Sequence, residues 1–220
     1  MIITIEGNIG SGKSTLLKAL KEHYIDNENI IFLKEPVEQW ANIVDENNIT
    51  MLEKFYSNKE KYSFSFQMMA YISRLALFKE AYKTNPNAIF ITERSLQTDK
   101  HVFAQMLHDS GTMEKVELEI YLKWFDHFAE DYQLSHVIYV DATPSKCMER
   151  IANRNRPGEN VIQYEYINDC DIYHKKMLEN FNSDQILTID GNIDIDPKNV
   201  VVNLWIQDIN PIINNLVETC

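Results

Sequence analysis

The most constraining feature of this chain is a glycine-rich motif near its start, GNIGSGKS at residues 7–14. A short apolar run, Ile2–Glu6, predicts a buried strand before the motif, and residues 15–20 carry an apolar stripe typical of a helix after it. The pattern G-x-x-x-x-G-K-[ST] therefore stands between a strand and a helix, where its mechanism requires it. Backbone N–H groups of such a loop surround phosphate oxygens, and the helix N-terminus favours negative charge. We expect a nucleoside triphosphate to bind here.

Each residue of this loop is a candidate phosphate contact. Lys13 is placed to reach the β- and γ-phosphates, and the Ser14 hydroxyl is of the type that holds Mg²⁺ beside them. The candidate phosphate-binding residues are Gly7, Asn8, Ile9, Gly10, Ser11, Gly12, Lys13, Ser14 and Thr15.

Five apolar runs predict strands, and helical patterns lie between them. The runs are 2–6, 30–34, 88–92, 136–141 and 185–190. This alternation predicts an α/β fold, a five-stranded parallel sheet with helices on both faces. Because we find no internal repeat, low-complexity tract or linker, we expect residues 1–220 to form a single domain. Ligands of such sheets bind beyond the carboxyl ends of the strands.

Composition narrows the partners and the compartment. The 21 basic and 33 acidic residues give a net charge of −12, which argues against a nucleic-acid polymer or an anionic membrane as the main partner. Three widely spaced cysteines favour a reducing compartment, and no run is apolar enough to span a membrane. The predicted strand at residue 2 leaves no room for a targeting segment. We therefore expect a cytoplasmic protein. The six histidines show no metal-binding spacing and are assigned no role.

Charged residues follow the second and third predicted strands. Pro36 keeps Glu35 out of helical geometry, so its carboxylate stays at the strand end. Glu35 is either a base that accepts a proton from a substrate hydroxyl or a cap of the short helix predicted at 37–40. Glu93 suits Mg²⁺ or its waters, and Arg94 suits a phosphate or the hydroxyl that receives it.

A long helix predicted over 62–83 places Phe66, Gln67, Ala70 and Arg74 on one face. Polar groups on a buried face need partners, because burying them unpaired is costly. This face therefore holds either an internal salt bridge or the wall of a ligand cleft, and the small Ala70 favours the cleft.

Three further candidates have two interpretations each. Asp99, near the start of a helix predicted at 97–108, either caps that helix or pairs with Arg74. Trp40 either packs in the core or walls a pocket for a flat base. A cluster of arginines is either a solvated helix end or a lid over the phosphates at about 150–160: Arg150, Arg154 and Arg156.

Two outer helices are predicted near the end of the fold. The helix at 113–131 carries an apolar face that is either core or a subunit interface: Val116, Ile120, Trp124 and Phe128. The final helix, at 197–217, is expected to turn three side chains inward: Val201, Leu204 and Trp205.

Five segments in this order resemble the deoxynucleoside kinase family: GNIGSGKST, EPVEQW, FQMMAYISR, ERSLQTD and RIANRNR. The resemblance covers roughly residues 1–190. It implies a P-loop kinase fold with a basic lid, transfer of the γ-phosphoryl group of ATP or another triphosphate to the 5′-hydroxyl of a deoxynucleoside for nucleotide salvage, and a homodimer.

The resemblance also implies roles for single residues. Glu35 would be the general base on the 5′-hydroxyl, Arg94 would contact the same region, and Glu93 would serve Mg²⁺. The lid would comprise Arg150, Arg154 and Arg156, and the loop after Asp190 would hold the adenine of ATP.

For the nucleoside, the resemblance implies that Tyr56 and Glu159 hold the 3′-hydroxyl and that Gln67 makes paired hydrogen bonds to the base. Phe66 and Phe103 would pack on the base, with Trp40 lining the pocket.

The residues Ala70, Arg74 and Asp99 resemble the branch of the family that uses cytosine and purine nucleosides. Relatives that favour thymidine tend to have a larger apolar residue, a methionine and an alanine at these positions. We therefore expect deoxyadenosine, deoxyguanosine or deoxycytidine to be preferred over thymidine. The pair Pro157-Gly158 departs from the family pattern beside the lid.

Two other functions share some of these features. A nucleoside monophosphate kinase of the thymidylate type would share the fold, loop and lid, but it should carry an Asp-Arg pair after the third strand and needs no base such as Glu35. A non-catalytic nucleotide-binding subunit should have lost Lys13, Glu35, Arg94 or a lid arginine.

Overall fold

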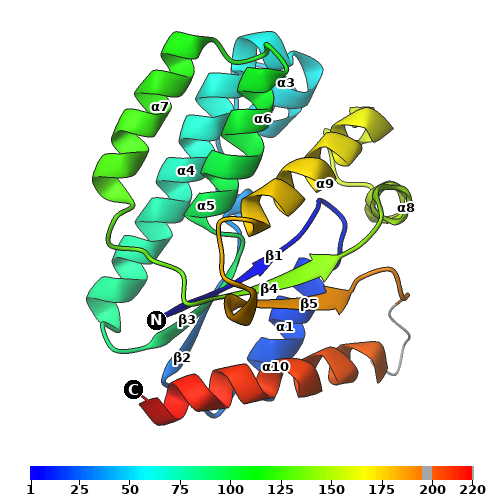
Figure 1. Cartoon of the computed structure of the whole chain (residues 1–220). Helices are drawn as coiled ribbons and strands as arrows, with labels where there is room; N and C mark the ends of the chain where they lie inside the picture. The colour runs from blue at the N-terminus through cyan, green and yellow to red at the C-terminus, as the bar shows by residue number, and fades with distance from the viewer. Residues whose placement is uncertain (195–199, 220) are drawn as a thin grey trace.

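A computed structural model describes residues 1–194 and 200–219, and within them five strands form one parallel sheet (Figure 1). The strands are β1 (Ile2–Glu6), β2 (Ile30–Leu33), β3 (Ile89–Glu93), β4 (His136–Asp141) and β5 (Ile186–Asp190). Their order in the sheet is β2-β3-β1-β4-β5. Ile3 of the central strand pairs with Ile91 on one side and His136 on the other. The predicted α/β fold is confirmed, and the predicted strand ends differ from these by a residue at most.

Helices cover both faces of the sheet, as Figure 1 shows. On one face α1 (Lys13–His23) and α10 (Val200–Thr219) pack against Ile3 and Ile5 of β1. On the other face lie α4 (Lys59–Thr84), α7 (Lys115–Phe128) and α9 (Tyr164–Leu178). Because strand side chains alternate between faces, β1 contributes to both cores and is fully buried.

Shorter elements connect these layers. They are α2 (Val37–Trp40), α3 (Met51–Ser57), α5 (Leu96–Thr98), η1 (Asp99–Ala104), α6 (Gln105–Asp109), α8 (Pro144–Arg154), η2 (Glu159–Val161) and η3 (Ser183–Gln185). No helix in the described ranges is both long and apolar enough to cross a bilayer.

The helix predicted at 97–108 is interrupted by a π-helical turn. The Ser95 side chain caps α5, the π-turn η1 follows at Asp99, and regular α-helix resumes in α6. Such widened turns are frequent at functional sites because they redirect a side chain without ending the helix. Here the turn begins at Asp99, whose side chain is buried.

The core interpretation of the α7 face is wrong. Four apolar side chains on this face are 41–55% exposed: Val116, Ile120, Trp124 and Phe128. The helix has a second apolar stripe, in which Tyr121 and Phe125 contact Tyr71 of α4. This aromatic stripe fills the core, so the first stripe faces outward.

The expected inner face of α10 is partly wrong. Trp205 is buried as expected, but Leu204 is 53% exposed and Val201 is only partly buried. The buried side chains at helical spacing are instead Val202, Trp205, Ile206, Ile209 and Ile213. The first residues of the predicted helix, 197–199, lie outside the described residues.

Candidate active site

The glycine-rich loop connects β1 directly to α1. Gly7, Gly10 and Gly12 have φ angles of 138°, 82° and 114°, in the left-handed region that favours glycine. A Cβ on Gly7 would also lie 2.5 Å from the carbonyl oxygen of Val140. The loop therefore requires glycine both for its turn and for its close approach to β4.

Side chains of the loop and of α8 hold it in shape. Asn8 Nδ2 donates to the carbonyl oxygen of Ile167 in α9 at 2.8 Å, and Arg150 Nη1 donates to that of Ser11 at 3.0 Å. Lys13 Nζ donates to the carbonyl oxygen of Asn8 at 2.6 Å. Burial, together with the nearby Arg94 cation, lowers the pKa of Lys13 to about 7, and a phosphate beside it would favour the charged form.

A cleft of about 890 Å³ opens beside the loop, at the carboxyl ends of β1, β2 and β3. Most of the predicted site residues line it: Ile9, Gly10, Gly12, Lys13, Ser14, Thr15, Glu35, Trp40, Tyr56, Phe66, Gln67, Ala70, Glu93, Arg94, Asp99, Phe103, Arg150, Arg154, Arg156 and Glu159. Gly7, Asn8, Ser11 and Arg74 are buried outside this lining. Most of the residues predicted from the sequence therefore lie around one cavity.

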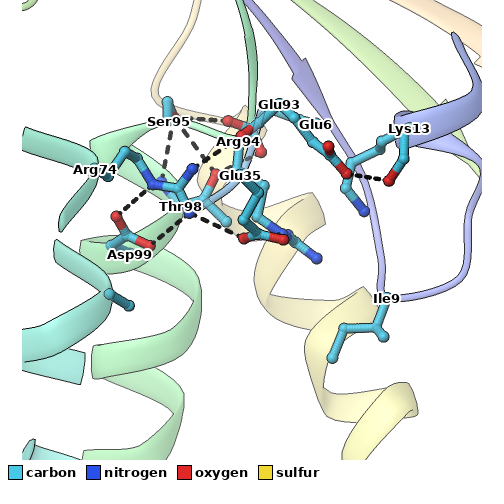
Figure 2. Close-up of polar contacts among 12 residues, drawn as sticks. Glu6, Ile9, Lys13, Glu35, Arg74, Glu93, Arg94, Ser95, Thr98 and Asp99 are labelled. Atoms are coloured by element: carbon cyan, nitrogen blue, oxygen red, sulfur yellow. Dashed lines mark hydrogen bonds and ion pairs between the residues drawn. The ribbon is translucent and has the colours of Figure 1, made fainter. Parts of the chain in front are cut away.

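Glu35 lies between two arginines, as Figure 2 shows. Its Oε1 is 3.0 Å from Arg74 Nη2 and 3.3 Å from Arg94 Nε. The capping interpretation is wrong, because Pro36 and not Glu35 occupies the N-cap of α2. Burial opposes ionisation, but the cations of Arg94, Arg74 and Lys13 outweigh it and lower the pKa of Glu35 below its ordinary value. Glu35 is therefore a carboxylate at neutral pH.

Arg74 pairs with two carboxylates, those of Glu35 and Asp99. Its Nε donates to Asp99 Oδ2 at 2.8 Å and its Nη1 donates to the carbonyl oxygen of Glu93 at 2.9 Å. The predicted Arg74–Asp99 pair is present, and the capping interpretation of Asp99 is wrong because Ser95 caps α5. Arg74 thereby fixes Asp99 and Glu35, both of which line the cleft, on one guanidinium (Figure 2).

Glu93 and the loop serine form the part of the cleft that suits a cation. Ser14 Oγ donates to Glu93 Oε1, and Glu93 Oε2 is buried without a hydrogen-bond partner in the described part of the chain. An orphaned carboxylate oxygen beside a hydroxyl provides oxygen ligands of the kind that Mg²⁺ takes. No cluster of three or more His, Cys, Asp and Glu residues occurs among residues 1–194 and 200–219.

The far end of the cleft is aromatic. Phe66 stacks on Phe55 with ring centroids 4.5 Å apart and meets the edge of Trp40 at 5.6 Å. Trp40 is also fixed by a 2.8 Å hydrogen bond from its Nε1 to Ser73 Oγ. Gln67 Oε1 is buried and has no hydrogen-bond partner among the described residues. This end of the cleft therefore combines aromatic walls with a polar atom that can hydrogen-bond a ligand.

The arginines of the predicted lid have protein partners. Arg154 Nη2 and Arg156 Nη1 lie 2.6 Å and 3.1 Å from the carboxylate of Glu159. Arg150 donates to backbone carbonyls of Ser11, Gly191 and Ile193, and so ties α8 to the glycine-rich loop and to the loop after β5. Glu159 therefore gathers two lid arginines at the rim of the cleft.

Sequence reasoning missed several residues of the site. Phe55 and Tyr166 line the cleft, and the buried Glu6, outside that lining, is bonded to the segment that follows Arg94. Glu6 is fully buried and accepts hydrogen bonds from Thr4 Oγ1 (2.8 Å), Ser95 Oγ (2.6 Å) and Thr98 Oγ1. A glutamate that ends the most buried strand was the available signal, since such a carboxylate must find partners.

Comparison with known sequences decides the family. A sequence model described as deoxynucleoside kinase matches residues 3–214. This chain belongs to the deoxynucleoside kinase family. It is an ATP-dependent kinase of deoxynucleosides, and the resemblance inferred from the motifs is confirmed.

Individual relatives agree with the family assignment. The probable deoxycytidine kinase of fowlpox virus (strain NVSL) is 35% identical over 205 residues, which cover 90% of this chain and 82% of the relative. The deoxycytidine kinase of Homo sapiens is 33% identical over 225 residues, covering 89% of this chain and 85% of the relative. Deoxycytidine kinase 1 of Xenopus laevis is 31% identical over 221 residues, covering 87% and 82%.

Proposed function

We propose that Glu35 is the general base of this deoxynucleoside kinase and takes the proton of the 5′-hydroxyl as that oxygen attacks the γ-phosphorus of ATP. The observation that supports this most is the position of its carboxylate, ionised between Arg74 and Arg94 at the cleft wall. In phosphoryl transfer the protein chiefly positions the reactants, neutralises charge and removes this proton.

The basic residues of the cleft bind the phosphates and stabilise the charge of the transferred group. Lys13 binds the β- and γ-phosphates, and Arg94 contacts the attacking hydroxyl and the transferred group. The lid residues Arg150, Arg154 and Arg156 stabilise the charge that spreads over the phosphoryl oxygens. Phosphate oxygens compete with Glu159 for Arg154 and Arg156, which pair with it in this structure.

The proposed magnesium site consists of the Ser14 hydroxyl and the Glu93 carboxylate. The buried, unpartnered Glu93 Oε2 supports this assignment, because a cation would satisfy it. When bound there, Mg²⁺ neutralises charge on the β- and γ-phosphates.

The nucleoside is proposed to occupy the aromatic end of the cleft. Tyr56 and Glu159 hold the 3′-hydroxyl, and Gln67 pairs with the base edge between Phe66 and Phe103, with Trp40 as a wall. Burial, and then the negative charge of Glu159, holds the pKa of Tyr56 well above its ordinary value, so its hydroxyl stays protonated and can donate.

We further propose that deoxycytidine, deoxyadenosine or deoxyguanosine is preferred over thymidine. Ala70 is small, and Arg74 and Asp99 form a pair that can donate to and accept from an amino- or oxo-bearing base edge. The names of the fowlpox, human and Xenopus relatives support deoxycytidine as one of the substrates.

A phosphoryl-transfer assay with Mg²⁺ and ATP tests this preference against four deoxynucleosides and their four monophosphates in parallel. We expect turnover of the nucleosides, with thymidine lowest in kcat/KM. Thymidine as the best substrate would overturn the interpretation of Ala70, Arg74 and Asp99. Turnover of monophosphates alone would remove Glu35 from its role as base.

We also propose that the protein is a homodimer and that it is located in the cytoplasm. The exposed apolar face of α7, with Ile72 of α4 exposed at 45%, supports a homodimer, since a hydrophobic patch of this kind commonly marks an interface. A cytoplasmic location is supported by two thiols without a disulfide, Cys147 and Cys170, both buried. Residues 1–220 would then form one catalytic domain with a lid at about 150–160.

A further inference from the structure

Arg94 has an unusual backbone conformation. Its φ angle is 64°, in the left-handed region that arginine rarely adopts. Two hydrogen bonds hold the backbone there: Arg94 N donates to the carbonyl oxygen of Ile5 at 3.0 Å, and Thr92 Oγ1 donates to that of Arg94 at 2.8 Å. Strained backbone persists where the surroundings enforce it, so the direction of this side chain is strongly determined.

A histidine that the proposed mechanism does not use contacts this side chain. His174 of α9 is fully buried, and its Nε2 lies 3.1 Å from Arg94 Nη1. Its Nδ1 lies 2.6 Å from the carbonyl oxygen of Cys170, one helical turn earlier.

These two contacts fix the tautomer of His174. A carbonyl oxygen can only accept and a guanidinium can only donate, so Nδ1 must carry the proton and Nε2 must accept from Arg94. Burial and the Arg94 cation hold the pKa of His174 well below its usual range, which agrees with a neutral ring.

The guanidinium of Arg94 is thus held from three directions. Glu35 lies at its Nε, His174 lies at its Nη1, and the ring of Phe103 lies 4.9 Å from its central carbon. Phe103 also meets the edge of the His174 ring, with centroids 6.2 Å apart. Because His174 is a neutral acceptor, it orients the guanidinium without cancelling the positive charge that the reaction uses.

We propose that His174 is a positioning residue for phosphoryl transfer, and that its Nε2 orients the Arg94 guanidinium toward the acceptor hydroxyl. This inference rests on the role of Arg94 in the proposed function. It gives a buried histidine of α9 a chemical role in the site, although this residue is 80 residues from Arg94 in the chain.

Two variants of His174 separate orientation from packing. His174→Phe keeps the ring volume but removes the acceptor, and we expect kcat to fall about 10- to 100-fold with a much smaller change in the nucleoside KM. His174→Gln can place an amide oxygen near the Nε2 position and should recover most of the loss. Equal kcat values for His174→Phe and the unmodified enzyme would overturn the inference, as would equally low kcat for both variants.

A double-mutant cycle shows whether the effect passes through Arg94. If it does, His174→Phe should cost less than about threefold once Arg94→Lys is present, because the oriented group is gone. An undiminished cost in that background would contradict the inference while leaving the proposed function standing. A normal kcat for Arg94→Lys alone would instead remove Arg94 from the proposed mechanism.

His108 provides a matched control, and NMR tests the tautomer without a measurement of activity. His108 Nδ1 also contacts a backbone carbonyl, that of Met113 at 3.0 Å, but His108 does not line the cleft. His108→Phe should leave kcat unchanged. The ¹⁵N spectrum of the unmodified enzyme should contain a signal of an imidazole protonated at Nδ1 alone at neutral pH that is lost in His174→Gln, whereas a signal from His108 remains. The absence of such a signal would overturn the tautomer and with it the inference.

Discussion

At the scale of single residues, the site consists of buried charges that satisfy one another. Glu35 and Asp99 share Arg74, and Arg94 adds a second cation beside Glu35. Removing one member of such a cluster leaves a buried charge without its partner, which costs more than the pair contributes to stability. The cluster therefore fixes both the geometry and the ionisation of Glu35.

The pH dependence of kcat should reveal this control of Glu35. The base must be a carboxylate, so activity is lost as pH falls through its pKa, which the surrounding cations lower. Arg74→Gln removes one of these cations, raises the pKa of Glu35 and should move the acid limb of kcat to higher pH. Lys100→Gln, which removes a cation paired with Asp126 instead, should leave the limb in place. Coincident limbs for Arg74→Gln and the unmodified enzyme would contradict the account.

Glu6 should contribute to the stability of the fold through its buried hydrogen bonds. Three hydroxyls donate to its buried carboxylate, and Glu6→Gln replaces one acceptor oxygen with a donor. We expect the free energy of unfolding in urea to fall by about 1–3 kcal/mol. The exposed Glu22→Gln on α1 should change it by less than about 0.5 kcal/mol. Equal stability of the two variants would show that the hydroxyl cluster contributes little.

Sequence reasoning found the charged residues of the cleft that follow strands or lie in the glycine-rich loop, and it missed residues whose role depends on partners far away in the chain. Glu35, Arg94 and Lys13 follow strands or lie in the loop, where chain direction alone predicts their position. His174 gave no such signal, because its partner Arg94 is 80 residues away in the chain. Glu6 ends β1, but its donors Ser95 and Thr98 are 89 and 92 residues away. Which distant side chains meet is decided by packing, which a single sequence does not encode locally.

At the scale of elements, the β1–loop–α1 unit is the part most constrained by backbone chemistry. Its glycines hold left-handed angles, and α8 and α9 bind the loop through Arg150 and Asn8. This unit was predictable because its conformation depends on residues adjacent in sequence.

Gly7→Ala tests that constraint. The added methyl would lie 2.5 Å from the carbonyl oxygen of Val140, at a φ of 138° that alanine rarely adopts. We expect a loss of about 1–3 kcal/mol in stability and weakened ATP binding, measured by urea unfolding and calorimetry. Gly111→Ala is the matched control, since its φ is 78° but nothing lies within 4 Å of the added atom. If Gly7→Ala cost no more than Gly111→Ala, the close approach to β4 would not matter.

Helix faces and helix continuity were less predictable than helix positions. Periodicity located α7 and α10, but each helix offered two apolar stripes, and tertiary packing selected one of them. The π-turn at Asp99 was also not predicted, since the sequence indicated only one continuous helix at 97–108.

At the scale of the whole molecule, the protein is acidic, but several of its basic side chains gather in the proposed active-site cleft. The net charge is −12, yet Lys13, Arg94 and the lid arginines line one cleft. On the outside, α7 presents an apolar face that the described part of this chain does not cover.

Trp124→Glu should therefore yield a monomer in sedimentation velocity at micromolar concentration, because it places a charge in the proposed interface. Ile25→Glu is a suitable control, since it makes the same kind of change at a residue 76% exposed in the turn after α1. If both variants sedimented as dimers, the α7 face would not be the interface. A monomeric unmodified protein would remove the proposed dimer.

The most direct test of the account is the turnover of Glu35→Gln measured together with its affinity for ATP. The amide keeps the size of the carboxylate but cannot accept the proton of the 5′-hydroxyl at neutral pH. We predict nucleotide binding close to that of the unmodified enzyme and a kcat with deoxycytidine lower by about 10²–10⁴-fold. A near-normal kcat would contradict the assignment of Glu35 as the base and, with it, the central claim about this site.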